Sequence, residues 1–303
     1  MFIYNENKYN LRVRRDFLRL KNTKWIGKER LHFEEIDSTN KKAKELAEAG
    51  CPNGLLITAD TQTAGTGRRG RSWASEKGSG IYMSLLLRPD LQPNEAPMLT
   101  LVSALAVAKA ITCSYEKKRK LYAQLTSTKA TCMYEQVANV DYEGPLYCRI
   151  KWPNDIVING KKICGILTEM TLNQSKIGAV ILGIGINVSN TCFDNNISST
   201  ASSLYLESNF EWESEPLIEE IWIWFEFYYA LFLETKDLSK LKAEYEEFLI
   251  NKNEKVNVLD PLGVYTGIAN GIRNTGELLV ETEAGIKTVS GGEVSVRGIY
   301  GYV

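Results

Sequence analysis

Apolar residues in the first part of the chain form short strand-like and helix-like runs. Strands are expected at 31–36, 54–59 and 81–87. The segment Asp37-Ser38-Thr39-Asn40 offers N-cap side chains for a helix over 41–49, which Gly50 ends. The nearly uncharged run 97–111 predicts a second helix, buried in the core.

The second part of the chain predicts further strands, then two helices, and then a series of short β-rich runs. Strands are expected at 149–158, 163–170 and 177–188, with turns at Asn159-Gly160 and Asn173-Gln174. Helices are expected at 215–235 and 238–250. From Asn253 onward, short β-rich runs separated by turn residues indicate a small all-β domain of about five strands. These runs are 255–259, 264–269, 278–282, 286–289 and 294–298.

Three segments carry no clear period. Residues 1–30 are polar, with a short helix expected around 10–20, and look too short for a winged helix-turn-helix domain. Residues 114–146 open on a charged run and are interpreted as an inserted loop, and 190–203 also resembles a loop. The expected organisation is a short N-terminal segment (1–30), a large domain (31–252, with the insert 114–146) and a small β domain (253–303).

Composition argues against several classes of protein. The 36 Lys and Arg residues nearly balance the 37 Asp and Glu residues, so no global charge favours a nucleic-acid partner. Six cysteines without a CxxC pair, and the single histidine His32, make a zinc site improbable. The most apolar stretch is predicted to be 221–233, which is interrupted by Glu226 and is too short to span a bilayer. No signal-peptide pattern is visible, and we expect a cytoplasmic protein without a membrane partner.

Residues 62–73 form a segment rich in glycine and arginine. Gly65, Gly67 and Gly70 fit G-x-G-x-x-G, but no apolar helix follows Gly70, so a dinucleotide site is not indicated. The guanidinium groups of Arg68, Arg69 and Arg71 suit phosphate or carboxylate oxygens. The segment is either a mobile loop that closes over an anionic ligand or an ordinary solvated basic loop.

A second candidate lies at Lys151-Trp152-Pro153-Asn154-Asp155, between two expected strands. A lysine at a strand end, fixed by Trp and Pro, could place its ammonium at a phosphate or carboxylate. Pro-Asn-Asp is also good turn chemistry, so a purely structural turn is the alternative.

Five segments together resemble the motifs of biotin protein ligases in order and spacing. They are Glu35-Ile36-Asp37-Ser38-Thr39-Asn40, the loop 62–73, the turn 151–155, Lys162-Ile163-Cys164-Gly165-Ile166-Leu167-Thr168-Glu169 and Gly183-Ile184-Gly185-Ile186-Asn187. The resemblance implies an α+β fold. It comprises a mixed central sheet with flanking helices, related to class II aminoacyl-tRNA synthetases, and a small C-terminal SH3-like β-barrel.

The same resemblance implies the site and the reaction. ATP activates biotin as biotinyl-AMP, and the biotin passes to a lysine of a biotin carboxyl carrier protein. Lys151 and Arg68 are the expected catalytic residues, and a Mg²⁺ ion is expected with the phosphates, with Asp155 as a candidate ligand. The residues expected at biotin are Ser38, Thr39, Asn40, Gln62, Arg68, Lys151 and Gly165. Those expected at the nucleotide are Arg68, Arg69, Arg71, Trp73, Asn154, Asn187 and Arg297.

The sequence departs from the biotin ligase motifs at one position and leaves two alternative functions open. Thr66 stands where many biotin ligases carry an arginine, so the resemblance leaves one expected contact to biotin without its residue. A lipoate-protein ligase of the same fold is the nearest alternative, followed by a transcriptional regulator that only senses biotin. No DNA partner is expected, because 1–30 looks too short for the DNA-binding domain of the bifunctional members. A homodimer is possible.

Overall fold

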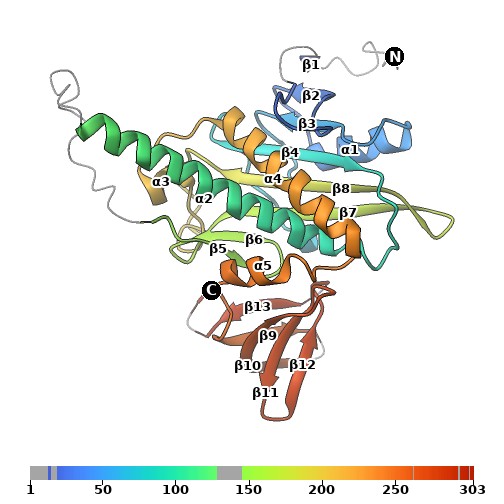
Figure 1. Cartoon of the computed structure of the whole chain (residues 1–303), viewed down its shortest axis with the longest axis vertical. Helices are drawn as coiled ribbons and strands as arrows, with labels where there is room; N and C mark the ends of the chain where they lie inside the picture. The colour runs from blue at the N-terminus through green and yellow to red at the C-terminus, as the bar shows by residue number, and fades with distance from the viewer. Residues whose placement is uncertain (1–12, 15–18, 128–144, 262, 293, 300) are drawn as a thin grey trace.

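The computed structural model describes residues 13–14, 19–127, 145–261, 263–292, 294–299 and 301–303. It contains an eight-stranded sheet and, below it in Figure 1, a five-stranded sheet built from the last part of the chain. The strands of the large sheet are β1 (Val13–Arg14), β2 (Arg30–Phe33), β3 (Leu56–Ala59), β4 (Gly80–Leu87), β5 (Cys148–Lys151), β6 (Asp155–Ile158), β7 (Lys161–Asn173) and β8 (Lys176–Asn187). The α-helices are α1 (Thr39–Glu48), α2 (Met98–Ser127), α3 (Leu204–Ser208), α4 (Ser214–Thr235) and α5 (Lys242–Phe248).

The large sheet is mixed and has the strand order β1-β2-β3-β4-β8-β7-β6-β5. Only β2 and β3 run parallel, because α1 connects them, and the other neighbouring pairs are antiparallel. The β6–β7 connection confirms the predicted turn, since Asn159 and Gly160 have φ values of 50° and 76°. The β7–β8 turn lies one residue later than predicted, at Gln174 and Ser175.

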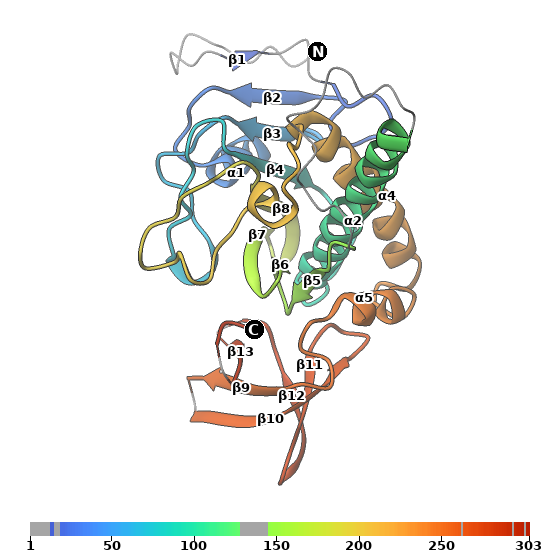
Figure 2. The same cartoon turned by 90° about the vertical axis from the view of Figure 1, so that its left-hand side faces the viewer.

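The two faces of the large sheet carry different covers, visible in Figure 2. Alternate residues such as Leu85 and Leu182 join the large core beneath α2 and α4. Their neighbours Leu86 and Ile181 point the other way, into a smaller core beneath α1. α1 is short, so it leaves part of its face of the sheet uncovered, and this uncovered part is where the expected motifs meet.

α2 corrects two expectations. The helix predicted at 97–111 continues through Ser127, so the first part of the predicted inserted loop is helical; residues 128–144 lie outside the described residues. The most membrane-like segment is also not 221–233 but part of α2. By length and composition alone, Met98–Gln124 would be long and apolar enough to cross a membrane. In the structure 72% of its most apolar window is buried, because α2 packs against α4 and the sheet.

The small sheet confirms the five predicted β runs. Its strands are β9 (Lys255–Asp260), β10 (Gly263–Ile272), β11 (Leu278–Thr282), β12 (Gly285–Val289) and β13 (Ser295–Gly298), in the antiparallel order β12-β11-β10-β9-β13. The preceding helix α5 is shorter than the predicted 238–250. Trp152, in the turn between β5 and β6, donates a hydrogen bond of 2.9 Å from Nε1 to the Gly276 carbonyl, so the small sheet contacts the candidate site.

The N-terminal part differs from its prediction where it is described. Val13–Arg14 form a short strand on the edge of the large sheet rather than part of a helix, and the other residues up to 18 lie outside the described range. The following loop is tied to α4, because the Glu226 carboxylate accepts hydrogen bonds from the backbone N–H groups of Lys24, Trp25 and Ile26. The strand predicted at 31–36 ends at Phe33.

Candidate active site

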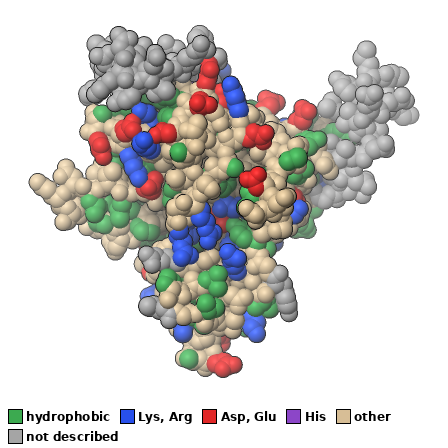
Figure 3. Space-filling view, turned by 180° about the vertical axis from the view of Figure 1, so that it is seen from behind, with side chains coloured by type: hydrophobic (Ala, Val, Ile, Leu, Met, Phe, Trp, Pro, Cys, Tyr) green, Lys and Arg blue, Asp and Glu red, His purple; other side chains and the backbone are tan. Residues whose placement is uncertain are grey.

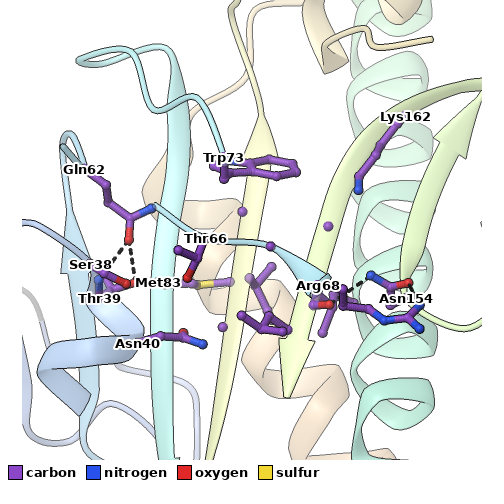
Figure 4. Close-up of a pocket in the computed structure, with 17 residues that line it drawn as sticks. Ser38, Thr39, Asn40, Gln62, Thr66, Arg68, Trp73, Met83, Asn154 and Lys162 are labelled. Atoms are coloured by element: carbon purple, nitrogen blue, oxygen red, sulfur yellow. Dashed lines mark hydrogen bonds between the residues drawn. The ribbon is translucent and has the colours of Figure 1, made fainter. Parts of the chain in front are cut away.

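A small cavity lies on the part of the sheet that α1 leaves uncovered, close to the start of α1 (Figure 4). Its walls come from the N-terminal end of α1, the loop 62–73, the turn before β6 and the strands β4, β7 and β8. The predicted biotin residues Ser38, Thr39, Asn40, Gln62, Arg68 and Gly165 all line it. The remaining one, Lys151, lines the adjoining cavity described below.

The polar end of this cavity is a hydrogen-bonded network. The Gln62 Oε1 atom accepts from the Thr39 backbone N–H at 2.8 Å and from the Thr39 hydroxyl at 3.1 Å. The Ser84 hydroxyl lies 2.8 Å from Thr39 Oγ1 and 2.6 Å from Asn40 Oδ1. The Asn40 amide donates to Glu169 at 2.8 Å, which fixes the orientation of the amide. These hydroxyl and amide groups offer donors and acceptors to a polar ring held at the start of α1.

Glycines form the floor of the cavity. Along the α1 face of β8, Ala179 and Ile181 pack in the core, and Gly183 and Gly185 then open the surface. A Cβ atom on Gly185 would lie 2.7 Å from the Trp73 indole, so the ring rests directly on the strand backbone. The indole N–H of Trp73 is buried and has no hydrogen-bond partner among the described residues. Since the cavity holds only about 50 Å³, Trp73 or its loop must shift to admit a ligand.

Gly183→Ala tests this floor. A Cβ atom at 183 would collide with the Asn40 amide oxygen, which lines the polar end of the cavity. We expect the variant to raise the KM for biotin about 10- to 100-fold and to leave kcat at saturating biotin near the wild-type value. Steady-state kinetics measures both. Gly178→Ala, on the same strand but outside both cavities, is the matched control, and an unchanged KM in Gly183→Ala would show that the ligand binds elsewhere.

A larger cavity of about 610 Å³ adjoins the first and extends to the small sheet. The two share residues Gly67, Arg68, Trp73, Asn154 and Lys162, so one continuous site runs through both. The cations Arg68, Arg69, Arg71, Lys151, Lys162 and Arg297 line the larger cavity. Figure 3 shows Lys and Arg side chains gathered between the upper body of the molecule and the small sheet. Such a concentration of positive charge suits a polyanion.

Arg68 joins the loop to two other parts of the site. Its guanidinium donates to Asn154 Oδ1 at 2.7 Å, to the Gly292 carbonyl at 3.0 Å and to the Gly291 carbonyl. Burial lowers the pKa of Arg68 from its usual value, and the nearby Asp155 opposes this shift. The loop itself forms a small hairpin, in which the Gly67 N–H donates to Arg71 O at 2.7 Å and the Trp73 N–H to Gly65 O at 2.8 Å.

Lys151 and Asp155 pair across β5 and β6 at the wall of the larger cavity. Burial lowers the pKa of Lys151 to about 8, with Asp155 opposing the shift and the neighbouring cations adding to it. Burial also opposes ionisation of Asp155, but Lys162 and Lys151 outweigh it and hold the Asp155 pKa below its usual value. Asp155 Oδ1 lies 2.6 Å from Lys162 Nζ, and Asp155 Oδ2 accepts from the Tyr302 hydroxyl. At neutral pH Lys151 is therefore mostly an ammonium and Asp155 a carboxylate.

The remaining predicted nucleotide residues also line the larger cavity. Arg69, Arg71 and Trp73 come from the loop, Asn154 from the turn, Asn187 from the end of β8 and Arg297 from β13. The Asn187 amide donates to the Ser202 carbonyl at 2.9 Å and so holds the loop 190–203 against the site. His32 lies apart from both cavities and contacts Thr58 and Asp60.

Two residues of the cluster, Lys162 and Tyr302, were given no role by the sequence analysis. Lys162 lines both cavities, and a β-bulge explains why strand alternation does not find it. Asp155 pairs with Gly165, but the register shifts after Ile156, so that Val157 pairs with Lys162. The bulge places Lys162 on the same face as Asp155, whereas uninterrupted alternation from Gly165 would point it away.

Comparison with known proteins finds a family match for each of the two sheets. Residues 32–187, more than half of the chain, match the biotin/lipoate A/B protein ligase family, and residues 253–297 match the biotin protein ligase C-terminal domain. The chain belongs to the biotin/lipoate A/B protein ligase family. The resemblance inferred from the five motifs is confirmed, as is the α+β fold with an SH3-like C-terminal domain.

Relatives within this family carry ligase names. The bifunctional ligase/repressor BirA of Bacillus spizizenii is 35% identical over 276 residues, which cover 90% of this chain and 76% of that protein. The biotin–[acetyl-CoA-carboxylase] ligase of Paracoccus denitrificans is 33% identical over 50% of this chain and 51% of its own length. The biotin protein ligase of Aquifex aeolicus, solved in complex with biotin and ATP, superposes with a TM-score of 0.69 at 29% identity. That match covers 89% of this chain and 98% of the other.

Proposed function

We propose that this chain is a biotin protein ligase. It joins the biotin carboxylate to the α-phosphate of ATP, releasing pyrophosphate, and then passes the biotin to a lysine of a biotin carboxyl carrier protein, releasing AMP. The observation that carries the proposal is the continuity of the site: a small polar cavity opens into a large cationic one at Arg68 and Lys162. A ligand with a polar ring at one end and a carboxylate at the other fits this arrangement.

The small cavity would hold biotin. Its ring urea needs an acceptor for its N–H groups and donors for its oxygen, which the Ser38, Thr39 and Asn40 segment offers. The glycine floor gives the flat ring system close access to the strand backbone. Gln62 anchors Thr39 rather than pointing freely into the cavity, so we assign it to positioning the pocket wall. The structure of the Aquifex relative with biotin and ATP supports this choice of ligands.

The large cavity would hold ATP and the reacting groups. A biotin carboxylate oxygen attacks the α-phosphorus, the bond to the pyrophosphate oxygen breaks, and pyrophosphate leaves with that electron pair. The developing negative charge on the phosphate oxygens would be stabilised by Arg68, Lys151, Lys162 and Arg297. No side chain needs to form a covalent bond. In the second step the acceptor amine attacks the acyl carbon, AMP leaves, and the amine nitrogen releases its proton.

The magnesium ion expected at Asp155 fits the residues of this chain poorly. Asp155 already pairs with Lys162 and Tyr302, so its oxygens are occupied. Magnesium is usually bound by one or two carboxylates together with substrate phosphates. We therefore assign Asp155 to organising the ammonium groups.

The pH dependence follows from Lys151. Burial lowers its pKa from 10.5 to about 8, so the ammonium form is lost as the pH rises above about 8, well before an ordinary lysine titrates. If the charged form stabilises the reacting phosphate, kcat/KM for ATP in biotin-dependent pyrophosphate exchange should decline on the alkaline side with a midpoint near pH 8. A rate that stays constant until strongly alkaline pH would exclude this role for Lys151.

The proposal is tested by mixing the protein with biotin, ATP, Mg²⁺ and a carrier domain, and measuring the mass of the carrier. One biotinyl adduct on one lysine is expected, and none when ATP is omitted. Lipoate replaces biotin in a parallel reaction, since a lipoate ligase remains the alternative within the family; the biotin-type C-terminal domain favours biotin. Transfer of lipoate alone would reject the proposal. We further propose a cytoplasmic enzyme that works without DNA or a membrane and is able to form a homodimer.

A further inference from the structure

The chain returns to the active site after β13. Residues Gly301–Val303 turn back towards the turn between β6 and β7, and Tyr302 reaches the wall of the larger cavity. Two glycines make room for this return. A Cβ atom on Gly298 would collide with the Val303 backbone, and one on Gly160 would lie 3.2 Å from the Val303 side chain. This return segment, Gly301–Val303, thus packs at a defined position against Gly298 and Gly160.

Tyr302 contacts two members of the charged cluster. Its hydroxyl donates to Asp155 Oδ2, and its ring centroid lies 4.1 Å from Lys151 Nζ. No hydrogen bond or ion pair joins Lys151 Nζ to any other residue within the described ranges, so the aromatic face is its direct partner there. An ammonium over an aromatic ring at this distance is held by a cation–π attraction, which is stronger when the pair is shielded from water.

We propose that Tyr302 is a positioning residue for formation of the adenylate, a role that rests on the proposed function. Asp155 Oδ1 forms an ion pair with Lys162, and Oδ2 accepts a hydrogen bond from Tyr302. Without the Tyr302 hydroxyl, Asp155 Oδ2 is free to pair with Lys151. The two residues already lie opposite each other, because Lys151 on β5 pairs with Asp155 on β6. Such a pair would neutralise the ammonium that the reacting phosphate needs. Tyr302 thereby keeps Lys151 available and links the small sheet to the chemistry.

The test compares Tyr302→Ala with Tyr302→Phe in biotin-dependent pyrophosphate exchange. Tyr302→Ala removes both contacts, and we expect kcat to fall about 10- to 100-fold while the KM for biotin is unchanged, because the biotin cavity does not include Tyr302. Tyr302→Phe keeps the ring and loses the hydroxyl, so kcat should fall only about 5- to 10-fold.

The pH profile supplies a readout that a loss of folding alone would not move. Removing the ring exposes Lys151 to water, and the alkaline limb should move to higher pH in Tyr302→Ala. Tyr302→Phe should move that limb less far, because the ring still covers the ammonium and only the freed Asp155 Oδ2 adds to its stabilisation. The charged groups that face Lys151 in both variants are Asp155, Lys162, Arg297 and Arg68, which remain unchanged.

Two glycine variants displace or spare the return segment without altering Tyr302. Gly298→Ala should reproduce the loss of kcat, because its Cβ atom displaces Val303. Gly301→Ala is the matched control, since its Cβ atom would meet nothing within 4 Å. Near wild-type kcat in folded Tyr302→Ala, or in Gly298→Ala, would overturn the inference. A wild-type enzyme without biotin-dependent exchange would instead overturn the proposed function, so the two failures are distinguishable.

Discussion

Lys151→Ala should lower the rate of biotin-dependent pyrophosphate exchange by about 100- to 1,000-fold, the usual cost of removing one charge-stabilising donor from a transition state. The Lys151 side chain is almost fully buried at the wall of the larger cavity, where water screens its charge little. The KM for biotin should change little, because the polar groups of the small cavity remain. Exchange of labelled pyrophosphate into ATP measures the first step by itself.

The control for this variant is Lys161→Ala. Lys161 is exposed at the start of β7 and lines neither cavity, so its loss should leave exchange intact. Exchange at close to the wild-type rate in Lys151→Ala would mean that the ammonium does not act on the phosphate. A thermal melt of both variants separates a lost charge from a lost fold.

Arg68→Gly should release biotinyl-AMP from the enzyme about 10- to 100-fold faster than the wild type. Arg68 holds the loop against Asn154 and against the carbonyls of Gly291 and Gly292, and a glycine removes all of these bonds. The loop would then no longer bridge the two cavities, so the anhydride would escape. Free adenylate acylates amines without selection, and bystander proteins in the mixture should become biotinylated.

Single-turnover release of the preformed adenylate provides the measurement. Lys77→Gly is the matched control, because it removes a cation from the exposed part of the same connection without touching either cavity. An off-rate in Arg68→Gly equal to that of the control would show that the Arg68 bonds do not retain the adenylate.

Much of the fold was accessible from the sequence because local pattern and tertiary structure agree there. The apolar run that becomes β4 and the Asn159-Gly160 turn are strong local signals, and the structure has both. The far end of α2 shows the limit of such signals. Its run of lysines and arginines resembles a loop, but it is the solvated side of a helix whose other side buries Ile111 and Tyr115.

The site was accessible in part for the same reason. The predicted residues all line the two cavities, because each motif lies at a strand end or helix start that the sheet brings to one face. Placing Lys162 in the site requires the position of the bulge after Ile156, and that position is set by the pairing of β6 with β7. Tyr302 reaches Asp155 across 147 positions of sequence, and no local pattern reports such a contact.

A structure determined with biotin and a non-hydrolysable ATP analogue, or with a stable analogue of biotinyl-AMP, tests the central claim most directly. Our account predicts that the Arg68 guanidinium and the Lys151 ammonium both lie within hydrogen-bonding distance of oxygens of the joined carboxyl and phosphate groups. The result that would contradict it is a bound ligand whose carboxyl and phosphate oxygens lie within hydrogen-bonding distance of neither Arg68 nor Lys151.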